Sequence, residues 1–406
     1  MDIKRTVLWV IFTMSLFMLW DNWARYNGKP SMFSPAPQTS SAPASASASA
    51  QAAAANGTAA AAAPGAAAPA AQRELITITT DVFKAQIDTL GGEVNHLELL
   101  QFKDHPQPKH FWDPFLEVIG AKEKAKDVKN IVLFDDGKKR TYLAQSGLAN
   151  ELWPNHKSVF TAKPGPRELA GGDTVQLVLE AEQNGVKLSK TFTFKKGSYA
   201  IDVRHAVTNQ TAAPVTPSLY LQLVHDGTKP EGASFMGGPG EFYAPAIYSD
   251  AEKFQKLDFE KIHKAEKESA GSSNNNHVKS AEQGWVAVIQ HFFVSAFVPQ
   301  DKGQREFRTA QVRDNVYSVS TIVPLGAIAA GATKESNATL YAGPQTTSVL
   351  EKIAPGLELV KDYGVLAIIC KPMFWLMDVL HSAIGNWGWT IVAFTVLIKL
   401  ALFPLS

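Results

Sequence analysis

The chain has 406 residues, 45% of them hydrophobic, and its 39 basic and 38 acidic residues leave a net charge of +1. This balance excludes a nucleic-acid partner held by bulk positive charge. The single cysteine, Cys370, excludes an intramolecular disulfide, a structural zinc cluster of cysteines and a CxxC redox pair. The averages resemble those of a soluble protein, so the positions of the apolar residues carry more information than their number.

An apolar segment opens the chain. After a basic start, residues 6–20 form an uncharged run of 15 residues, which reaches about 22 Å as a helix and needs its flanks to cross a hydrocarbon core of about 30 Å. A cleaved signal peptide is the alternative, but the small residues that cleavage requires come only at 44–50. We therefore expect an uncleaved transmembrane anchor over residues 1–24, with its N-terminus in the cytoplasm.

The next segment, residues 25–72, has an unusual composition. From 30 to 72 there is no charged residue and no Ile, Leu or Val, and residues 36–71 include 20 alanines. Proline and glycine interrupt the helical preference of alanine, and nothing here can form a packed face. We expect a flexible linker that lets the following domain stand away from the membrane.

Residues 73–345 carry short alternating or β-rich runs between turn signals such as Gly91-Gly92 and Lys195-Lys196-Gly197. With little helical periodicity, this pattern predicts one large β-sandwich and argues against a parallel α/β sheet. Residues 252–277, rich in Lys, Glu, Ser and Asn, predict a short helix followed by a mobile loop. The expected strands are 75–79, 82–87, 174–181, 186–194, 199–207, 218–224, 285–298 and 316–323.

The C-terminal part is helical in its pattern. We expect a short helical connection at 346–362, an amphipathic helix at 363–386 and a transmembrane helix at 387–406. Pro372 suits the first turn of the amphipathic helix, and Gly385 suits its end. A stripe rich in Met and Trp is more often core packing, but here it directly precedes a membrane span, which favours a helix that rests on the membrane surface.

The sequence lacks the common enzyme signatures HExxH, GxSxG, a Walker-type loop and a dinucleotide fingerprint. The histidines in or beside expected strands lack a readable orienting partner, so we interpret them as structural or surface residues. We expect no catalytic residue, no cofactor and no metal. These histidines are His96, His205, His225 and His291.

Lys399 is the most informative side chain. It is the only charge in residues 387–405, about 18 Å along a helix from Trp387. A lysine near the centre of a lipid-facing helix costs about 2.5–3.5 kcal/mol on insertion scales, so such residues usually face a cavity, a partner helix or water. The alternative is that Lys399 extends to the far interface, because only six residues separate it from Leu405.

Several segments resemble the YidC membrane-protein insertases of Gram-negative bacteria. The resemblance rests on MDIKRTVLWVIF at the N-terminus, QGWVAVIQHFFVSAFVP at 283–299, YAGP at 341–344 and DYGVLAIICKPMFWLMDVLHSAIGNWGWTIVAFTVLIKLALFPLS at 362–406. It implies an N-terminal anchor, a large periplasmic β-supersandwich, an interfacial helix and a helical membrane core. The low-complexity linker does not contribute to it.

In this family the membrane core has five spans around a positively charged hydrophilic groove, which is open to the cytoplasm and the lipid. A basic residue on the first span draws in the polar or acidic tail of an incoming protein. By its place in the motif that residue is Lys399 here, where the familiar form carries arginine. Lysine keeps the charge but lacks the bidentate fork, so an electrostatic role survives and a fixed geometric role becomes doubtful.

The resemblance also implies a location and partners. The expected location is the bacterial inner membrane, with residues 25–386 in the periplasm. The partners are nascent membrane proteins, the Sec translocon including its SecDF accessory, the ribosome and the lipid bilayer.

Since the chain stops at Ser406, one helix into such a core, we expect this polypeptide alone to fail at insertion. Two other functions stay open at this point. One is a membrane-tethered domain that binds or modifies sugars, because the supersandwich resembles aldose epimerases in architecture, although no His and carboxylate motif supports it. The other is a passive periplasmic scaffold.

Overall fold

The computed structural model describes residues 73–104, 129–137, 140–169, 171–228, 243–268, 277–361 and 367–402. All of them belong to one of the two units into which the chain divides, Ala67–Ser406. The expected anchor at 1–24 and linker at 25–72 lie outside the described residues, as does the loop expected after residue 268 and before 277.

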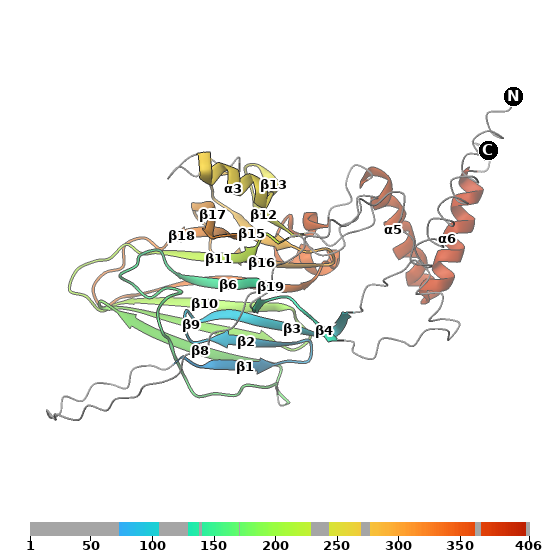
Figure 1. Ribbon diagram of the computed structural model, residues 1–406. Helices are drawn as coiled ribbons and strands as arrows, with labels where there is room; N and C mark the ends of the chain where they lie inside the picture. The colour runs from blue at the N-terminus through green and yellow to red at the C-terminus, as the bar shows by residue number, and fades with distance from the viewer. Residues whose placement is uncertain are drawn as a thin grey trace, which may run out of the picture. The chain divides into compact units, whose positions relative to one another are not determined.

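Two antiparallel sheets form the body of the molecule (Figure 1). The first sheet has the order β1-β2-β3-β6-β11-β18-β17-β14, with β4 paired to β3 and β5 to β6. Its strands are β1 Leu75–Thr79, β2 Phe83–Asp88, β3 Glu93–Asp104, β4 Lys129–Val132, β5 Asp135–Asp136, β6 Thr141–Leu148, β11 Ser218–Asp226, β14 Ser280–Ala281, β17 Arg305–Arg313 and β18 Val316–Pro324.

The second sheet has the order β13-β12-β15-β16-β19-β10-β9-β8-β7. Its strands are β7 Thr161–Ala162, β8 Thr174–Gln183, β9 Val186–Lys195, β10 Ala200–Asn209, β12 Ala244–Ser249, β13 Lys253–Lys256, β15 Gly284–Ile289, β16 Phe293–Pro299 and β19 Thr333–Pro344.

One hydrophobic core joins the two sheets. Side chains alternate across each strand, so residues two apart share a face. On β8, Val175, Leu177 and Leu179 are buried, and they belong to the same core cluster as Ile78 and Ile87 of the first sheet. Each such side chain contributes about 1.5–3 kcal/mol relative to an exposed position. The expected β-sandwich is therefore confirmed.

Most expected strands are present, with two corrections. Residues 285–298 form two paired strands, β15 and β16, because the chain reverses at 290–292 without a Gly or Pro to signal it. The expected helix within 252–277 is preceded by strand β13, and helix α3, Phe259–Glu268, starts only after it. The turn expected at Lys195-Lys196-Gly197 is confirmed, because it joins β9 to its partner β10 as a hairpin, with Gly197 at φ +68°.

Helix α4, Thr347–Ile353, and the 3₁₀ helix η1, Leu357–Val360, pack on the outer face of the second sheet. Leu350 and Leu357 are fully buried beside Trp285 of β15. The Trp285 indole stacks on Tyr248 at 5.5 Å and donates a hydrogen bond to the Pro355 carbonyl at 3.1 Å. These contacts fix the segment that leads to the C-terminal helices.

The C-terminal helices α5, Ala367–Ile384, and α6, Trp387–Leu402, pack against each other (Figure 1). The expectation that Pro372 opens α5 is wrong, because the helix starts five residues earlier and Pro372 lies inside it. Gly385, with φ +71°, ends α5 as expected. The Asn386 side chain then accepts hydrogen bonds from the backbone N–H groups of Gly388 and Trp389, so it caps α6.

Candidate functional site

Helix α6 exposes an apolar surface. Its more buried positions lie on one side of the helix and mark the face toward α5; they are Thr390, Ala393, Phe394 and Ile398. Trp389 and Leu400 are 68% and 70% exposed. Contiguous exposed apolar surface of this kind is typical of a region that meets lipid or another protein.

Lys399 lies within this exposed apolar surface. Val392 and Val396, which are seven and three residues earlier and thus on the same face, are both more than half exposed. The Lys399 side chain is itself exposed. The residue singled out from the sequence is therefore a cation surrounded by apolar side chains on the surface of α6.

Helix length limits what these residues span by themselves. Helix α6 has 16 described residues, which correspond to about 24 Å. Within the described part of the chain, no helix has both the length and the apolar character needed to cross a membrane.

A second lysine, Lys190 of β9, lies fully buried between the sheets. Its Nζ donates hydrogen bonds to the carbonyls of Gly91 at 2.6 Å, Gly92 at 3.2 Å and Ser146 at 2.7 Å. It also lies 4.6 Å from the centre of the Phe160 ring. Burial lowers the pKa of Lys190 to about 7. Gly91 and Gly92 lie in the turn between β2 and β3, and Ser146 lies on β6, so all three carbonyls come from the first sheet and its connections. Because Lys190 belongs to the second sheet, this ammonium links the two sheets.

Glu93 adds a buried carboxyl group near this lysine. It accepts a hydrogen bond from the Gln145 amide at 2.5 Å, and Gln145 in turn accepts one from Gln222 at 2.5 Å. Burial raises the pKa of Glu93 to about 7, although the Gln145 hydrogen bond and the positive charge of Lys190 oppose the rise. The Glu93 carboxyl group is thus part of a hydrogen-bonded chain with the Gln145 and Gln222 amides that crosses β3, β6 and β11.

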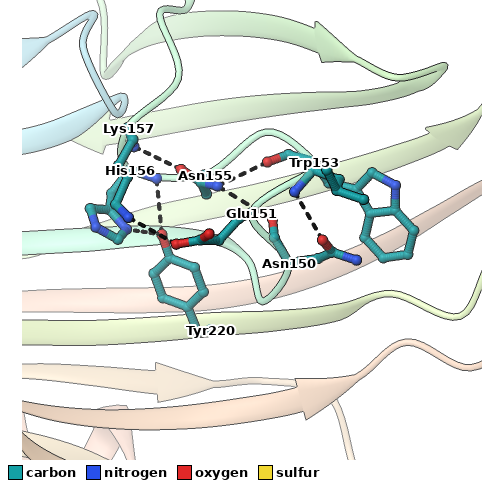
Figure 2. Close-up of polar contacts among 8 residues, drawn as sticks. Asn150, Glu151, Trp153, Asn155, His156, Lys157 and Tyr220 are labelled. Atoms are coloured by element: carbon teal, nitrogen blue, oxygen red, sulfur yellow. Dashed lines mark hydrogen bonds and ion pairs between the residues drawn. The ribbon is translucent and has the colours of Figure 1, made fainter.

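Close to the same end of the sandwich, the loop after β6 is tied to β11 by Tyr220 (Figure 2). The Tyr220 hydroxyl accepts a hydrogen bond from the His156 backbone N–H at 2.9 Å and lies 2.6 Å from His156 Nδ1. The Asn155 amide donates to the carbonyls of Asn150 and Trp153, as the dashed lines in Figure 2 show. Burial lowers the pKa of His156. His156 is therefore a loop anchor.

A sugar-processing site would need His and carboxylate groups that can meet a substrate. The candidate groups at this end of the sandwich have partners within the fold instead. Glu93 is hydrogen-bonded to Gln145, Lys190 to backbone carbonyls and His156 to Tyr220. Among the described residues, no group of three or more His, Cys, Asp or Glu side chains could hold a metal ion. The sugar-processing alternative is not favoured.

The histidines of the expected strands have the structural surroundings we inferred. His205 is fully buried, 2.9 Å from the Ser146 hydroxyl, and burial lowers its pKa to about 3. His225 is buried among aromatic rings, with Tyr142 at 4.6 Å. His96 lies 3.8 Å from Asp135 at the surface, and the His291 ring meets the Phe292 ring edge to face at 4.0 Å.

Sequence reasoning missed Lys190 and Glu93. The signal for Lys190 was present, because Val186, Leu188, Phe192 and Phe194 alternate on β9 and place residue 190 on the same inward face. No comparable pattern marks Glu93, whose burial depends on neighbours from two other strands.

Comparisons with known proteins address the chain as a whole. A membrane protein insertase YidC from Janthinobacterium sp. (strain Marseille) is 52% identical over 416 residues, which cover 100% of this chain and 69% of that protein. Another from Herminiimonas arsenicoxydans is 51% identical over 418 residues, covering 100% and 68%.

Among solved structures, a galactose mutarotase-like protein from Lactobacillus casei ATCC 334 matches at a TM-score of 0.35 with 12% identity, covering 66% of this chain and 100% of that one. A likeness at this level supports no inference about activity. Residues 121–376 match the family model of the YidC periplasmic domain. With this match and relatives about half identical over the whole chain, the protein belongs to the YidC family of membrane protein insertases, which act on nascent membrane proteins in the bacterial inner membrane.

Proposed function

We propose that Lys399 supplies the charge by which this insertase draws the polar or acidic part of a nascent membrane protein into the bilayer. The observation that carries the proposal is its position on α6, exposed on the same face as Val392 and Val396 rather than buried against α5. A cation in apolar surroundings attracts a carboxylate more strongly than it would in bulk water. Its attraction for an incoming acidic segment would offset part of the cost of moving that segment through hydrocarbon.

Helix α6 would contribute to the wall of a hydrophilic groove in the membrane. The apolar surface around Lys399 suits lipid or the neighbouring helices of such a groove. The apolar segment of the substrate would then move into lipid along these helices. No covalent bond is made or broken in this scheme, so the proposed role is that of a chaperone and insertase and not of an enzyme.

The proposed topology follows the segments of the sequence. Residues 1–24 would anchor the chain with a cytoplasmic N-terminus, and residues 25–386 would lie in the periplasm. Within that portion, 25–72 would be a linker, 73–345 the β-supersandwich, 346–362 a helical connection and 363–386 an interfacial helix. Residues 387–406 would form the first span of a multi-pass core. The exposed Phe374 and Trp375 on α5 support the interfacial placement.

The proposed partners follow from the same scheme. Nascent chains would arrive from the ribosome, either directly or beside the Sec translocon and its SecDF accessory. The β-domain would serve as a rigid periplasmic scaffold, since its buried charged groups are used to hold its own sheets together.

The test uses cells in which insertion depends on this protein, with the chromosomal codon for Lys399 changed. Lys399→Ala should impair insertion of a reporter with an acidic translocated segment, whereas Lys399→Arg should preserve it. Thr395→Ala, a neighbouring exposed position on α6, is the matched control at equal protein level. Equal insertion by the parent, Lys399→Ala and Lys399→Arg would overturn the proposal and favour extension of Lys399 to the far interface.

A further inference from the structure

A pocket of about 1140 Å³ lies where β13, α4, η1 and α5 meet. Its size is that of a site for a substantial organic ligand. It is separate from Lys399 and from the buried Lys190 cluster, and neither shares a lining residue with it. Six charged side chains line it, namely Lys253, Lys256, Lys361, Glu351, Glu358 and Asp378.

Three walls of the pocket are fixed to the second sheet. Leu350 of α4 and Leu357 of η1 are fully buried against this sheet. Phe254 of β13 packs on the Trp285 ring at 6.2 Å. Lys253 has a left-handed backbone with φ +59°, a conformation that a non-glycine residue adopts only where the surroundings hold it. The polar groups on these walls are therefore displayed from a preformed frame.

The fourth wall is helix α5, which contributes Phe374, Trp375 and Asp378. The Lys361 ammonium lies 4.3 Å from the centre of the Phe374 ring. Phe374 and Trp375 are 42% and 67% exposed. The pocket is thus bordered by aromatic surface of the type that proteins place at the depth of lipid headgroups.

The charged side chains that line the pocket indicate which class of ligand fits it. Three ammonium groups and three carboxylates line one pocket, so each of the two charges of a zwitterion meets groups of the opposite sign there. A zwitterion whose cation can donate hydrogen bonds satisfies both sets. The bordering aromatic surface offers contact to acyl chains, which a free soluble headgroup would not use.

We infer that this pocket binds the headgroup of a phosphatidylethanolamine-type phospholipid. The phosphate would contact Lys253 and Lys256, and the primary ammonium would donate to Glu351, Glu358 or Asp378. A choline headgroup carries a quaternary ammonium and cannot donate these hydrogen bonds, and a glycerol headgroup brings no cation at all. The inference rests on the proposed function only in placing α5 at the membrane surface.

The test is native mass spectrometry of the purified full chain in detergent micelles, with dimyristoyl phosphatidylethanolamine, phosphatidylcholine and phosphatidylglycerol in equal amounts. We expect the ethanolamine lipid to be retained about tenfold better than the other two, the factor that one hydrogen bond to a charged group provides. Lys253→Glu with Lys256→Glu should abolish retention of the ethanolamine lipid. Lys84→Glu with Lys334→Glu, two exposed lysines on β2 and β19, should retain it.

A second pair of variants keeps the test informative if charge reversal disturbs folding. Glu351→Gln with Glu358→Gln should remove the preference for ethanolamine over choline while phosphatidylcholine binding stays unchanged. Equal retention of all three lipids, tightest binding of phosphatidylglycerol, or equal loss in the Lys84 and Lys334 control would overturn the inference. So would full competition by soluble phosphoethanolamine at the same concentration, because the acyl chains would then contribute nothing. Lys399→Ala should leave lipid retention unchanged, which separates this inference from the proposed insertion mechanism.

Discussion

Lys190 and Lys399 are two lysines in apolar surroundings, and their environments differ in one decisive respect. Lys190 is enclosed between two sheets, where three carbonyls from Gly91, Gly92 and Ser146 accept its hydrogen bonds. Lys399 stands exposed on the apolar surface of α6. A buried charge is tolerated where the fold supplies its partners, and an exposed charge on an apolar helix is available for a partner from outside.

The same contrast extends to the surrounding regions. In the β-domain the large apolar side chains are mostly buried in one core, and its polar groups form ladders such as Glu93, Gln145 and Gln222. On α6 the apolar side chains face outward. The first arrangement stabilises the sandwich, and the second leaves an apolar surface of the kind that suits lipid or another protein.

Removing the Lys190 clamp should have the largest effect on stability. Lys190→Met keeps the length of the side chain but leaves three buried carbonyls without their donor, at a cost of about 3 kcal/mol. Thermal unfolding of the chain at pH 6, where Lys190 carries its charge, followed by tryptophan fluorescence, should show a Tm lower by roughly 6–12 °C. Lys84→Met, at an exposed position, is the control. A similar Tm in both variants would show that Lys190 does not hold the sheets together.

The next effect on stability is expected at Gly91, where the backbone closely approaches His156 beside the Lys190 clamp. Gly91 has φ +81°, and a Cβ there would lie 2.6 Å from the His156 carbonyl oxygen. Gly171 has nearly the same φ, +84°, with nothing within 4 Å of its Cβ position. Gly91→Ala should therefore lower the free energy of unfolding by about 2 kcal/mol more than Gly171→Ala does, because only the first adds overpacking to backbone strain. If urea unfolding shows the same loss of stability for both variants, overpacking contributes nothing and backbone strain alone accounts for the destabilisation.

A third expected stability effect, at Glu93, depends on pH. Burial raises the pKa of Glu93 to about 7 from 4.5, so its contribution to stability is present below pH 4.5 and is lost as the pH rises through 7. Glu93→Gln cannot ionise, so between pH 5 and pH 8 it should gain about 2 kcal/mol of stability relative to the parent, because each unit of raised pKa corresponds to about 1.4 kcal/mol. Urea unfolding at the two pH values measures this difference. If the parent gains stability relative to Glu93→Gln as the pH rises, the pKa of Glu93 is not raised and the prediction is contradicted.

The sequence predicts those parts of the molecule that depend on local periodicity. Alternation on β8 and β9 was sufficient for strands and for the sandwich, and it also places Lys190 inward, although the residue type discouraged that conclusion. The reversal between β15 and β16 was missed because an apolar run conceals a turn that lacks Gly and Pro. There, Gln345, which directly follows β19 and is more than 50 residues away in the sequence, fixes the turn by donating hydrogen bonds to the carbonyls of Gln290 and Phe293. Contacts between residues so far apart in the sequence cannot be read from a local pattern of residue types.

Lys399 shows the same difference between what a local sequence pattern predicts and what depends on the fold. Its isolation in an uncharged stretch was visible in the sequence, but the face it occupies on α6 depends on which side of the helix packs on α5. The pocket beside α5 could not be predicted at all, since its charged residues come from four elements that the fold brings together.

The most direct test of the account is a charge exchange at Lys399 in the cellular insertion assay. With Lys399→Glu, a reporter whose translocated segment is acidic should insert about tenfold less efficiently than with the parent, a factor that corresponds to about 1.4 kcal/mol of lost attraction. The same reporter with lysines in place of its acidic residues should recover insertion in the Lys399→Glu variant. If the parent and the variant insert both reporters equally well, the charge of Lys399 does not meet the substrate and the central claim fails.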